Sequence, residues 1–123
     1  MIVIRSNITK ILILILFSVN FLFAQDVEFK TSNFKSDKEG LKMALQNIKL
    51  GDEFLKMGND AILRRNDAIR FFEQALFYYL QAHQFNRNNI ELNMKIGNSY
   101  LYSNQKYLAY SFLKEAMLLD EKN

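Results

Sequence analysis

The chain contains no cysteine, no proline and no tryptophan, and it has four glycines and one histidine among 123 residues. Without cysteine there is no disulfide, no thiol nucleophile, no cysteine-based metal site and no lipid carried on a cysteine behind a leader. The absence of proline and the scarcity of glycine argue against β-sandwich and collagen-like folds. Leucine, lysine, glutamine, alanine and methionine are frequent instead, and these residues favour helices.

The formal net charge of +3 comes from 16 basic and 13 acidic residues. Two of the basic residues, Arg5 and Lys10, lie in residues 1–24, which contain no acidic residue. Removal of residues 1–24 would leave 16 − 2 = 14 basic residues against 13 acidic ones, a charge of +1. A composition this close to neutral argues against nucleic-acid binding.

The amino terminus has the layout of a secretory signal. An apolar run over residues 11–24 follows the two basic residues, is broken by Ser18 and Asn20, and ends at Ala24. The run is shorter than the ~20 apolar residues that a spanning helix needs. We therefore predict a signal peptide over residues 1–24, cleaved before Gln25, and an exported protein. Leu22 is larger than the small residue preferred there, so a retained amino-terminal anchor is the alternative.

Residues 90–123 have the spacing of one helical hairpin with small residues between large ones. The spaced residues are, in chain order, Ile96, Gly97, Tyr100, Ala109, Leu113 and Ala116. Gly97 and Ala109 would let two antiparallel helices approach closely, with the large residues packed on either side. Asn104 and Gln105 would form the polar turn between the helices. This is the pattern of a tetratricopeptide repeat (TPR), so residues 90–123 resemble one repeat of that family. Asn93 and Glu121 depart from it, since Trp and Pro are commonest there.

A first, less regular repeat is predicted over about residues 44–89. Ser36 and Glu39 have the spacing of a capping box, so a helix should begin there, after a flexible lead over residues 25–35 that is either extended or disordered. An apolar stripe then follows at three- and four-residue intervals: Leu41, Ala44, Leu45, Ile48, Gly51, Leu55 and Gly58. Gly51 and Phe54 repeat the spacing of Gly97 and Tyr100. The matching second helix would contain Ala75, Tyr79 and Ala82.

The first repeat must carry an insertion. Gly51 and Ala82 are 82 − 51 = 31 residues apart, whereas Gly97 and Ala116 are 116 − 97 = 19 apart, a difference of 12. Residues 57–67 are the place for it, either as a longer loop or as additional helix. The fold class expected over residues 36–123 is therefore all-α, a TPR-type solenoid of about two repeats.

Both second helices carry apolar residues on several faces, including Phe71, Phe77 and Tyr78 in the first repeat and Phe112 and Met117 in the second. A helix that is apolar on most faces must be covered on most faces. No polar capping helix follows the last repeat, although solenoids usually need one. We expect that the native chain continues past residue 123. Coverage by a partner or by a second copy is the alternative.

The stretch over residues 77–116, and residues 88–103 most specifically, resembles the amino-terminal TPR region of exported, OmpA-like proteins associated with the outer membrane. The resemblance covers about residues 40–123. In that family the repeats precede a β-propeller and a peptidoglycan-binding domain, and some members belong to a secretion and gliding apparatus. None of the propeller or peptidoglycan-binding residues occur in this chain. The resemblance therefore implies a place in the cell envelope, as the amino-terminal part of a longer protein associated with the outer membrane or peptidoglycan, and it suggests the propeller and peptidoglycan-binding functions only for the rest of that protein.

A TPR pair presents the inner faces of its first helices to a partner. The predicted groove residues are Ile48, Asp52, Leu55, Lys56, Met94, Asn98, Leu101 and Tyr102. Asn98 matches the asparagine of carboxylate-clamp members, but Met94 and Tyr102 stand where the clamp has cations, so no clamp is expected. The mixture suits an apolar helix or extended segment. The alternative is that these residues only pack against the neighbouring repeat.

No constellation for catalysis, metal or cofactor binding can be assembled. His83 is the chain's single histidine and is expected to be a packed or surface residue. Asp52 and Glu53 are adjacent, so they point about 100° apart on a helix and do not pair. Arg64, Arg65 and Arg70 form a local basic cluster, which is most simply a solvated turn.

The sequence therefore predicts a protein-interaction module, with no enzyme activity and no cofactor, in the periplasm or on the periplasmic face of the outer membrane. Its partners would be proteins of the cell envelope, and membrane association would come only through other parts or partners. The alternative function is a structural spacer or self-association module whose groove stays empty.

Overall fold

Four α-helices follow one another within residues 24–123, the part of the chain that the computed structural model describes. They are α2 (Lys38–Leu63), α3 (Ile69–Phe85), α4 (Ile90–Leu101) and α5 (Ala109–Asp120), with a short 3₁₀ turn, η1 (Lys106–Leu108), before α5. This part of the chain contains no strand and is all-α. The signal predicted over residues 1–24 lies, apart from Ala24, outside the described residues.

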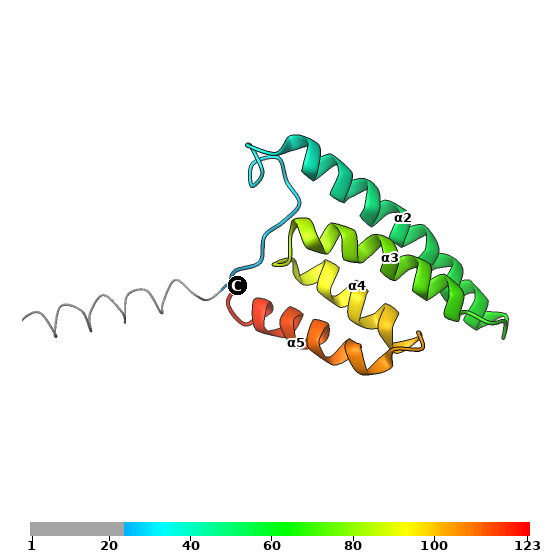
Figure 1. Ribbon diagram of the computed structural model, residues 1–123. Coiled ribbons are helices and arrows are strands. Elements are labelled where there is room, and N and C mark those ends of the chain that lie inside the picture. The colour runs from blue at the N-terminus through cyan, green and yellow to red at the C-terminus, as the bar shows by residue number, and fades with distance from the viewer. Residues whose placement is uncertain (1–23) are drawn as a thin grey trace, which may run out of the picture.

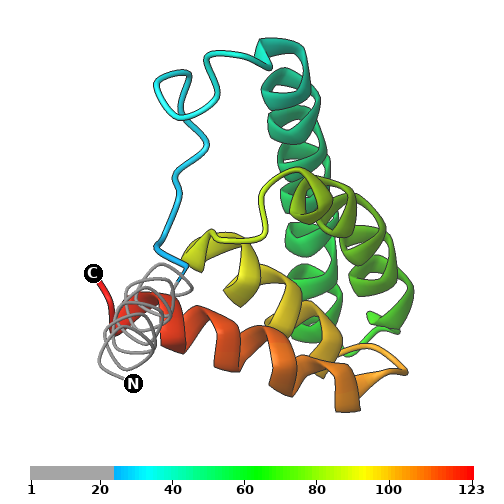
Figure 2. The ribbon, with the colours of Figure 1, turned by 60° about the vertical axis from the view of Figure 1, so that its left-hand side comes forward.

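The helices lie side by side in chain order, each antiparallel to the one before it, so that two helical hairpins stack on each other (Figures 1 and 2). The shared core lies between α2, α3 and α4 and continues to the start of α5. Tyr79 and Ile96, each 0% exposed, are at its centre. The long apolar stripe of α2 packs on α3, whose small residues allow the two helices to approach closely.

Each hairpin has a glycine of its first helix beneath a large side chain of its second. A Cβ atom at Gly51 would lie 2.4 Å from the Tyr79 ring, and one at Gly97 would lie 2.5 Å from the Leu113 side chain. Gly51 and Tyr79 are 79 − 51 = 28 residues apart, and Gly97 and Leu113 are 113 − 97 = 16 apart. The sequence separations of these two contacts differ by 28 − 16 = 12 residues, the length that the sequence spacing predicts for the insertion.

Residues 57–63, most of the segment proposed to be inserted, are additional helix, and residues 64–68 connect it to α3. Because α2 continues to Leu63, its last two turns extend beyond the end of the second hairpin (Figure 1). A small separate core of Ala61, Ala68 and Phe72 stabilises this extension, and Gly58 packs under the Phe72 ring. Apolar residues that bury against α3 explain why the chain stays helical here rather than forming a loop.

The start of α2 differs from the predicted capping box. The N-cap is Asp37, whose Oδ1 accepts a hydrogen bond from the Gly40 amide at 2.8 Å. Ser36 lies one residue outside the helix, because a backbone turn from the Asp37 amide to the Phe34 carbonyl ends there. Glu39 is in the first turn, where a carboxylate complements the helix dipole, but it does not close a box with Ser36.

The end of α2 has the hydrogen bonds of a Schellman motif with arginine in place of glycine. The Asn66 amide donates to the Ala61 carbonyl at 2.8 Å and the Arg65 amide to the Ile62 carbonyl at 3.0 Å. Arg65 has φ 58°, the left-handed region that side chains with a Cβ disfavour.

We expect Arg65→Gly to stabilise the protein by about 0.5–1 kcal/mol, since glycine adopts this conformation without strain and Arg65 is exposed. Urea unfolding followed by circular dichroism measures the change. Arg64→Gly, one residue earlier at an ordinary φ of −87°, is the control and should destabilise slightly. Equal effects of the two substitutions would contradict the prediction.

The lead over residues 25–35, predicted to be flexible, is instead docked on the turn between α3 and α4. Asn86 donates from Nδ2 to the Val27 carbonyl at 2.7 Å, and Asn89 donates to the same oxygen at 3.1 Å. Asp26 accepts from the Ile90 amide at 2.9 Å, at the first turn of α4. Phe29 and Phe34 lie against the Phe85 ring, with ring centroids 6.5 and 4.7 Å apart. The lead thus covers an aromatic side chain that would otherwise be exposed.

We expect Asn86→Ala to cost about 1–2 kcal/mol and to release the lead, because Asn86 is buried and also accepts from the Asn88 amide. Hydrogen exchange of residues 24–35 should accelerate, while exchange in the middle of α3 and α4 stays slow. Asn33→Ala is the matched control, since Asn33 is exposed and bonds only within the lead. Unchanged hydrogen exchange of the lead in Asn86→Ala would show that the Asn86 side chain does not hold the lead in place.

Candidate functional site

The predicted groove residues lie on α2 and α4 and at the end of α4, and they divide into two groups. Lys56, Met94, Asn98, Leu101 and Tyr102 are exposed, whereas Ile48, Asp52 and Leu55 are half-buried. Leu55 packs against both apolar cores, and Tyr102 stacks on the Phe72 ring at 4.9 Å between centroids. Leu55 and Tyr102 are therefore packing residues as much as surface residues.

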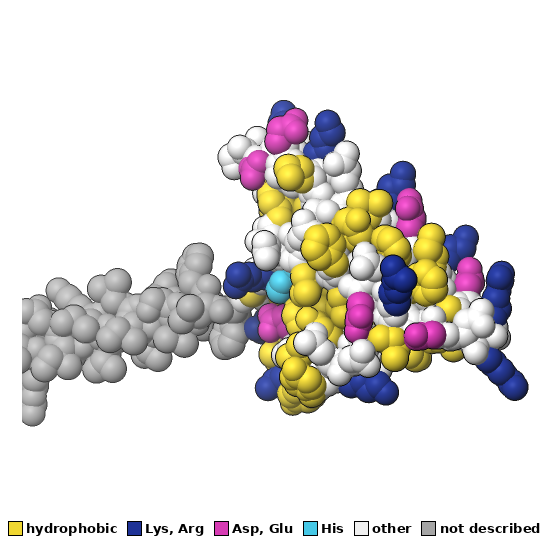
Figure 3. All heavy atoms as spheres, turned by 45° about the vertical axis from the view of Figure 1, so that its right-hand side comes forward, with side chains coloured by type: hydrophobic (Ala, Val, Ile, Leu, Met, Phe, Trp, Pro, Cys, Tyr) yellow, Lys and Arg dark blue, Asp and Glu magenta, His cyan; other side chains and the backbone are white. Residues whose placement is uncertain are grey.

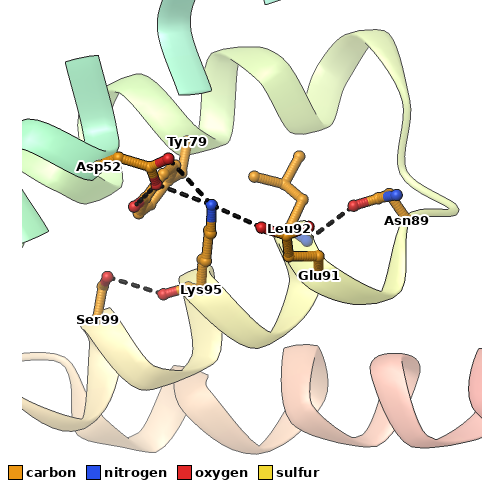
Figure 4. Close-up of polar contacts among 7 residues, drawn as sticks. All are labelled: Asp52, Tyr79, Asn89, Glu91, Leu92, Lys95 and Ser99. Atoms are coloured by element: carbon orange, nitrogen blue, oxygen red, sulfur yellow. Dashed lines mark hydrogen bonds and ion pairs between the residues drawn. The ribbon is translucent and has the colours of Figure 1, made fainter. Parts of the chain in front are cut away.

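Asp52 lies in a polar network that joins α2, α3 and α4 (Figure 4). The Tyr79 hydroxyl donates to Asp52 Oδ1 at 2.6 Å. Lys95 Nζ lies 2.9 Å from the same oxygen and 3.1 Å from Oδ2, and it also pairs with Glu91 at 2.9 Å. Asp52 thus links the two hairpins and is already occupied by protein partners.

The electrostatics of this network favour structure over proton transfer. Burial, together with the hydrogen bond to Asp52, raises the pKa of Tyr79 far above its ordinary value. Burial lowers the pKa of Lys95, but hydrogen bonds to Glu91 and Asp52 outweigh it and leave the pKa raised. A general acid or base needs a pKa near neutrality, and both shifts lead away from it.

We expect Tyr79→Phe to lower the free energy of unfolding by about 1.5 kcal/mol at neutral pH, through loss of the hydrogen bond to the Asp52 carboxylate. The raised folded-state pKa of Tyr79 means that the neutral phenol stabilises the fold below pH 10.0, its ordinary value, and that this stability is lost as pH rises above it. The wild type should therefore lose more stability than Tyr79→Phe in urea unfolding above about pH 10. Parallel pH profiles for the two proteins would contradict this.

A pocket of about 350 Å³ lies between the lead, α2 and the start of α4. Its apolar lining is Phe29, Leu45, Ile48 and Leu92, and its polar lining includes Glu91 and Lys95. Among the predicted groove residues, only Ile48 lines it. The sequence pattern missed the contribution of the lead, because no local signal in residues 25–35 shows that they return to the turn before α4.

Another pocket, of about 290 Å³, is lined by His83, Asn93, Phe112 and Glu115 from α3, α4 and α5. Asn93 is 0% exposed, and its Nδ2 donates to the Arg87 and Asn89 carbonyls at 2.8 and 2.9 Å. Asn93 Oδ1 has no partner that meets hydrogen-bond geometry within the described chain. Burial lowers the pKa of His83, and its interaction with the Asn93 side chain opposes this shift. Figure 3 shows the histidine at the surface beside hydrophobic side chains.

Within residues 24–123, no group of three or more histidine, cysteine, aspartate or glutamate side chains is placed to hold a metal ion. Among the helices of the same range, none combines the length and the apolar character needed to cross a bilayer.

No protein-family model matches the chain, and neither a curated protein nor a solved structure shows significant similarity to it.

Proposed function

We propose that this chain is a TPR-type interaction module of an exported cell-envelope protein and that it binds a partner protein through the exposed face of α4. The observation that carries this proposal is the repeated glycine contact, Gly51 beneath Tyr79 and Gly97 beneath Leu113. Two hairpins built on the same contact and stacked in chain order are what a helical-repeat scaffold requires. The resemblance of residues 88–103 to exported OmpA-like proteins supports the location.

The exposed face of α4 has the chemistry of a protein contact. Met94 and Leu101 are 48% and 44% exposed, and Asn98 between them is also exposed. Apolar side chains around one amide suit an apolar helix or extended segment, because the amide can bond a main-chain group while the apolar atoms are buried. Asp52, by contrast, has its carboxylate held by Tyr79 and Lys95, so its role in the proposal is rigidity.

The test is crosslinking in native cells, followed by purification from the envelope fraction and mass spectrometry. A double variant, Met94→Ser with Leu101→Ser, should lose a specific envelope partner while its circular dichroism stays unchanged. Tyr102 is left intact, because its replacement would remove the stacking on Phe72 and could lower stability as well as binding. The control, Tyr107→Ser with Tyr110→Ser, changes two residues that are 75% and 71% exposed elsewhere and should keep the partner. Equal recovery by both double variants would refute the proposal, as would location of the protein in the cytosol.

Self-association is the second candidate function, and the surface of α5 and η1 favours it. Tyr107, Tyr110 and Met117 are all exposed there, and exposed large side chains are typical of contact surfaces. If this face joins two copies, the control variant above should convert a dimer into a monomer in sedimentation experiments. A wild-type protein that is monomeric at high concentration would exclude this candidate.

A further inference from the structure

Three lysines follow one another along one face of the first half of α2. Lys38, Lys42 and Lys49 are spaced by four and seven residues, which keeps their side chains within about 40° of one another around the helix. All three are exposed, and none of them forms an ion pair with any residue in the described part of the chain. The near-neutral composition conceals this row, which extends over about 16 Å.

The lysine row borders a hollow with an apolar floor. A pocket of about 420 Å³ is lined by Lys38, Lys42, Lys49, Leu41, Leu45, Gln46 and Thr31. No carboxylate belongs to this lining, and Thr31 comes from the lead, which forms one wall. Leu45 is 44% exposed, so apolar surface remains available at the floor.

Leu45 also lines the pocket of about 350 Å³ that contains Phe29, Ile48 and Leu92. The two hollows therefore adjoin along the lead, and we call the combined feature the lead groove. One end of the lead groove is basic and its middle is apolar. The remaining charged residues of its lining are already paired, Lys95 with Glu91 and Lys30 with Glu28. The unpaired charge of the groove is thus positive and confined to the half beside the lysine row.

We propose that the lead groove binds an acidic segment of a partner protein, with apolar side chains of that segment placed over Leu45 and Ile48. Carboxylates would meet the three unpaired lysines, and apolar anchors would cover the exposed floor. Leu41 and Leu45 lie beside the three lysines in the same lining, so the surface matches a chain segment that carries carboxylates and apolar side chains together. This inference rests on the proposed function and supplies the chemistry of its partner, at a place apart from Met94 and Leu101.

Selection from a random peptide display library tests the lead groove directly. The full chain is compared with the variant Lys38→Glu/Lys42→Glu/Lys49→Glu and with a control of equal charge change, Arg70→Glu/Lys106→Glu/Lys114→Glu. The wild type and the control should enrich peptides that combine aspartate or glutamate with leucine, isoleucine or phenylalanine. The lysine variant should bind these peptides at least about tenfold more weakly. Leu45→Ser, which keeps every charge, should weaken them as well. Circular dichroism checks that each variant is folded.

Several results would overturn the inference. Enriched peptides without acidic residues, undiminished binding by the lysine variant, or no enrichment by the wild type would each do so. Binding to vesicles of phosphatidylglycerol and phosphatidylcholine is measured in parallel. If the wild type binds the vesicles, the lysine variant does not, and no acidic peptide is enriched, the lysines bind a lipid surface instead. Peptides that depend on Met94 and Leu101 but not on the lysines would refute the lead groove and leave the proposed function standing. The proposed function fails separately, if no envelope partner depends on Met94 and Leu101 in native cells.

Discussion

Replacing Gly51 with valine is expected to lower the free energy of unfolding by about 3 kcal/mol, near the upper limit of overpacking effects. The added Cβ would lie 2.4 Å from a ring atom of Tyr79. That ring is 0% exposed and held by its hydrogen bond to Asp52, so it has no free space into which to move. Helices α2 and α3 would have to separate, and the loss should shift Tm downward by more than about 10 °C.

Gly97→Val is the matched control for this prediction. A Cβ there would meet Leu113 at 2.5 Å, but Leu113 is only half-buried and its flexible side chain can turn away. The expected loss is therefore about 1 kcal/mol. Valine has a higher helix propensity than glycine, so a loss at Gly51 cannot come from propensity. Gln46→Val, on the exposed side of α2, shows the effect of a valine in this helix that meets no buried ring. If Gly51→Val is no worse than Gln46→Val, Tyr79 does not hold the two helices at a fixed distance.

Phe72→Ala is expected to be the most damaging large-to-small substitution at the far end of the first hairpin, with a loss of about 4 kcal/mol. Phe72 is 1% exposed and is the largest member of the small core formed with Ala61 and Ala68. Its removal also deprives the Tyr102 ring of its stacking partner. Hydrogen exchange should accelerate first in the last two turns of α2, before the rest of that helix.

Phe77→Ala is the same substitution on the same helix and should change stability by less than about 0.5 kcal/mol. Phe77 is 60% exposed, so its truncation removes little buried area. Urea unfolding of both variants gives the comparison. If Phe72→Ala lowers the free energy of unfolding as little as Phe77→Ala does, the extension of α2 contributes nothing to the stability of the global fold.

Periodicity and glycine spacing predict the helical class, because both express contacts that repeat locally along the chain. Gly97 and Ala109, for example, are close in sequence, and the hairpin that joins them is short. The cap of α2 could not be assigned by spacing alone, since Ser36 and Asp37 are both good N-caps and a turn from Phe34 decides between them.

The docking of the lead could not be predicted, because it depends on residues far away in the sequence. Val27 is held by Asn86 and Asn89. The four successive polar residues 86–89 have the composition of a solvated loop, and nothing near them in the sequence identifies their distant acceptor. The same limit applies to the candidate site. Lys95 and Asp52 are 43 residues apart and meet only once the second hairpin stacks on the first. The pattern therefore identified Asp52 as a surface residue when its carboxylate already has two partners.

The extension of α2 beyond the second hairpin leaves Leu63 and the arginine pair after it far from the shared core, with Leu63 82% exposed. Helices α2 and α3 are held together by contacts that include Gly51 and Tyr79, well away from this tip. The polypeptide can therefore be interrupted between Arg64 and Arg65 without dividing the folded body, since the two pieces keep their mutual packing. The tip is therefore a site that tolerates insertion: a tag, a fluorophore or new chain ends can be introduced there while both candidate binding surfaces stay intact.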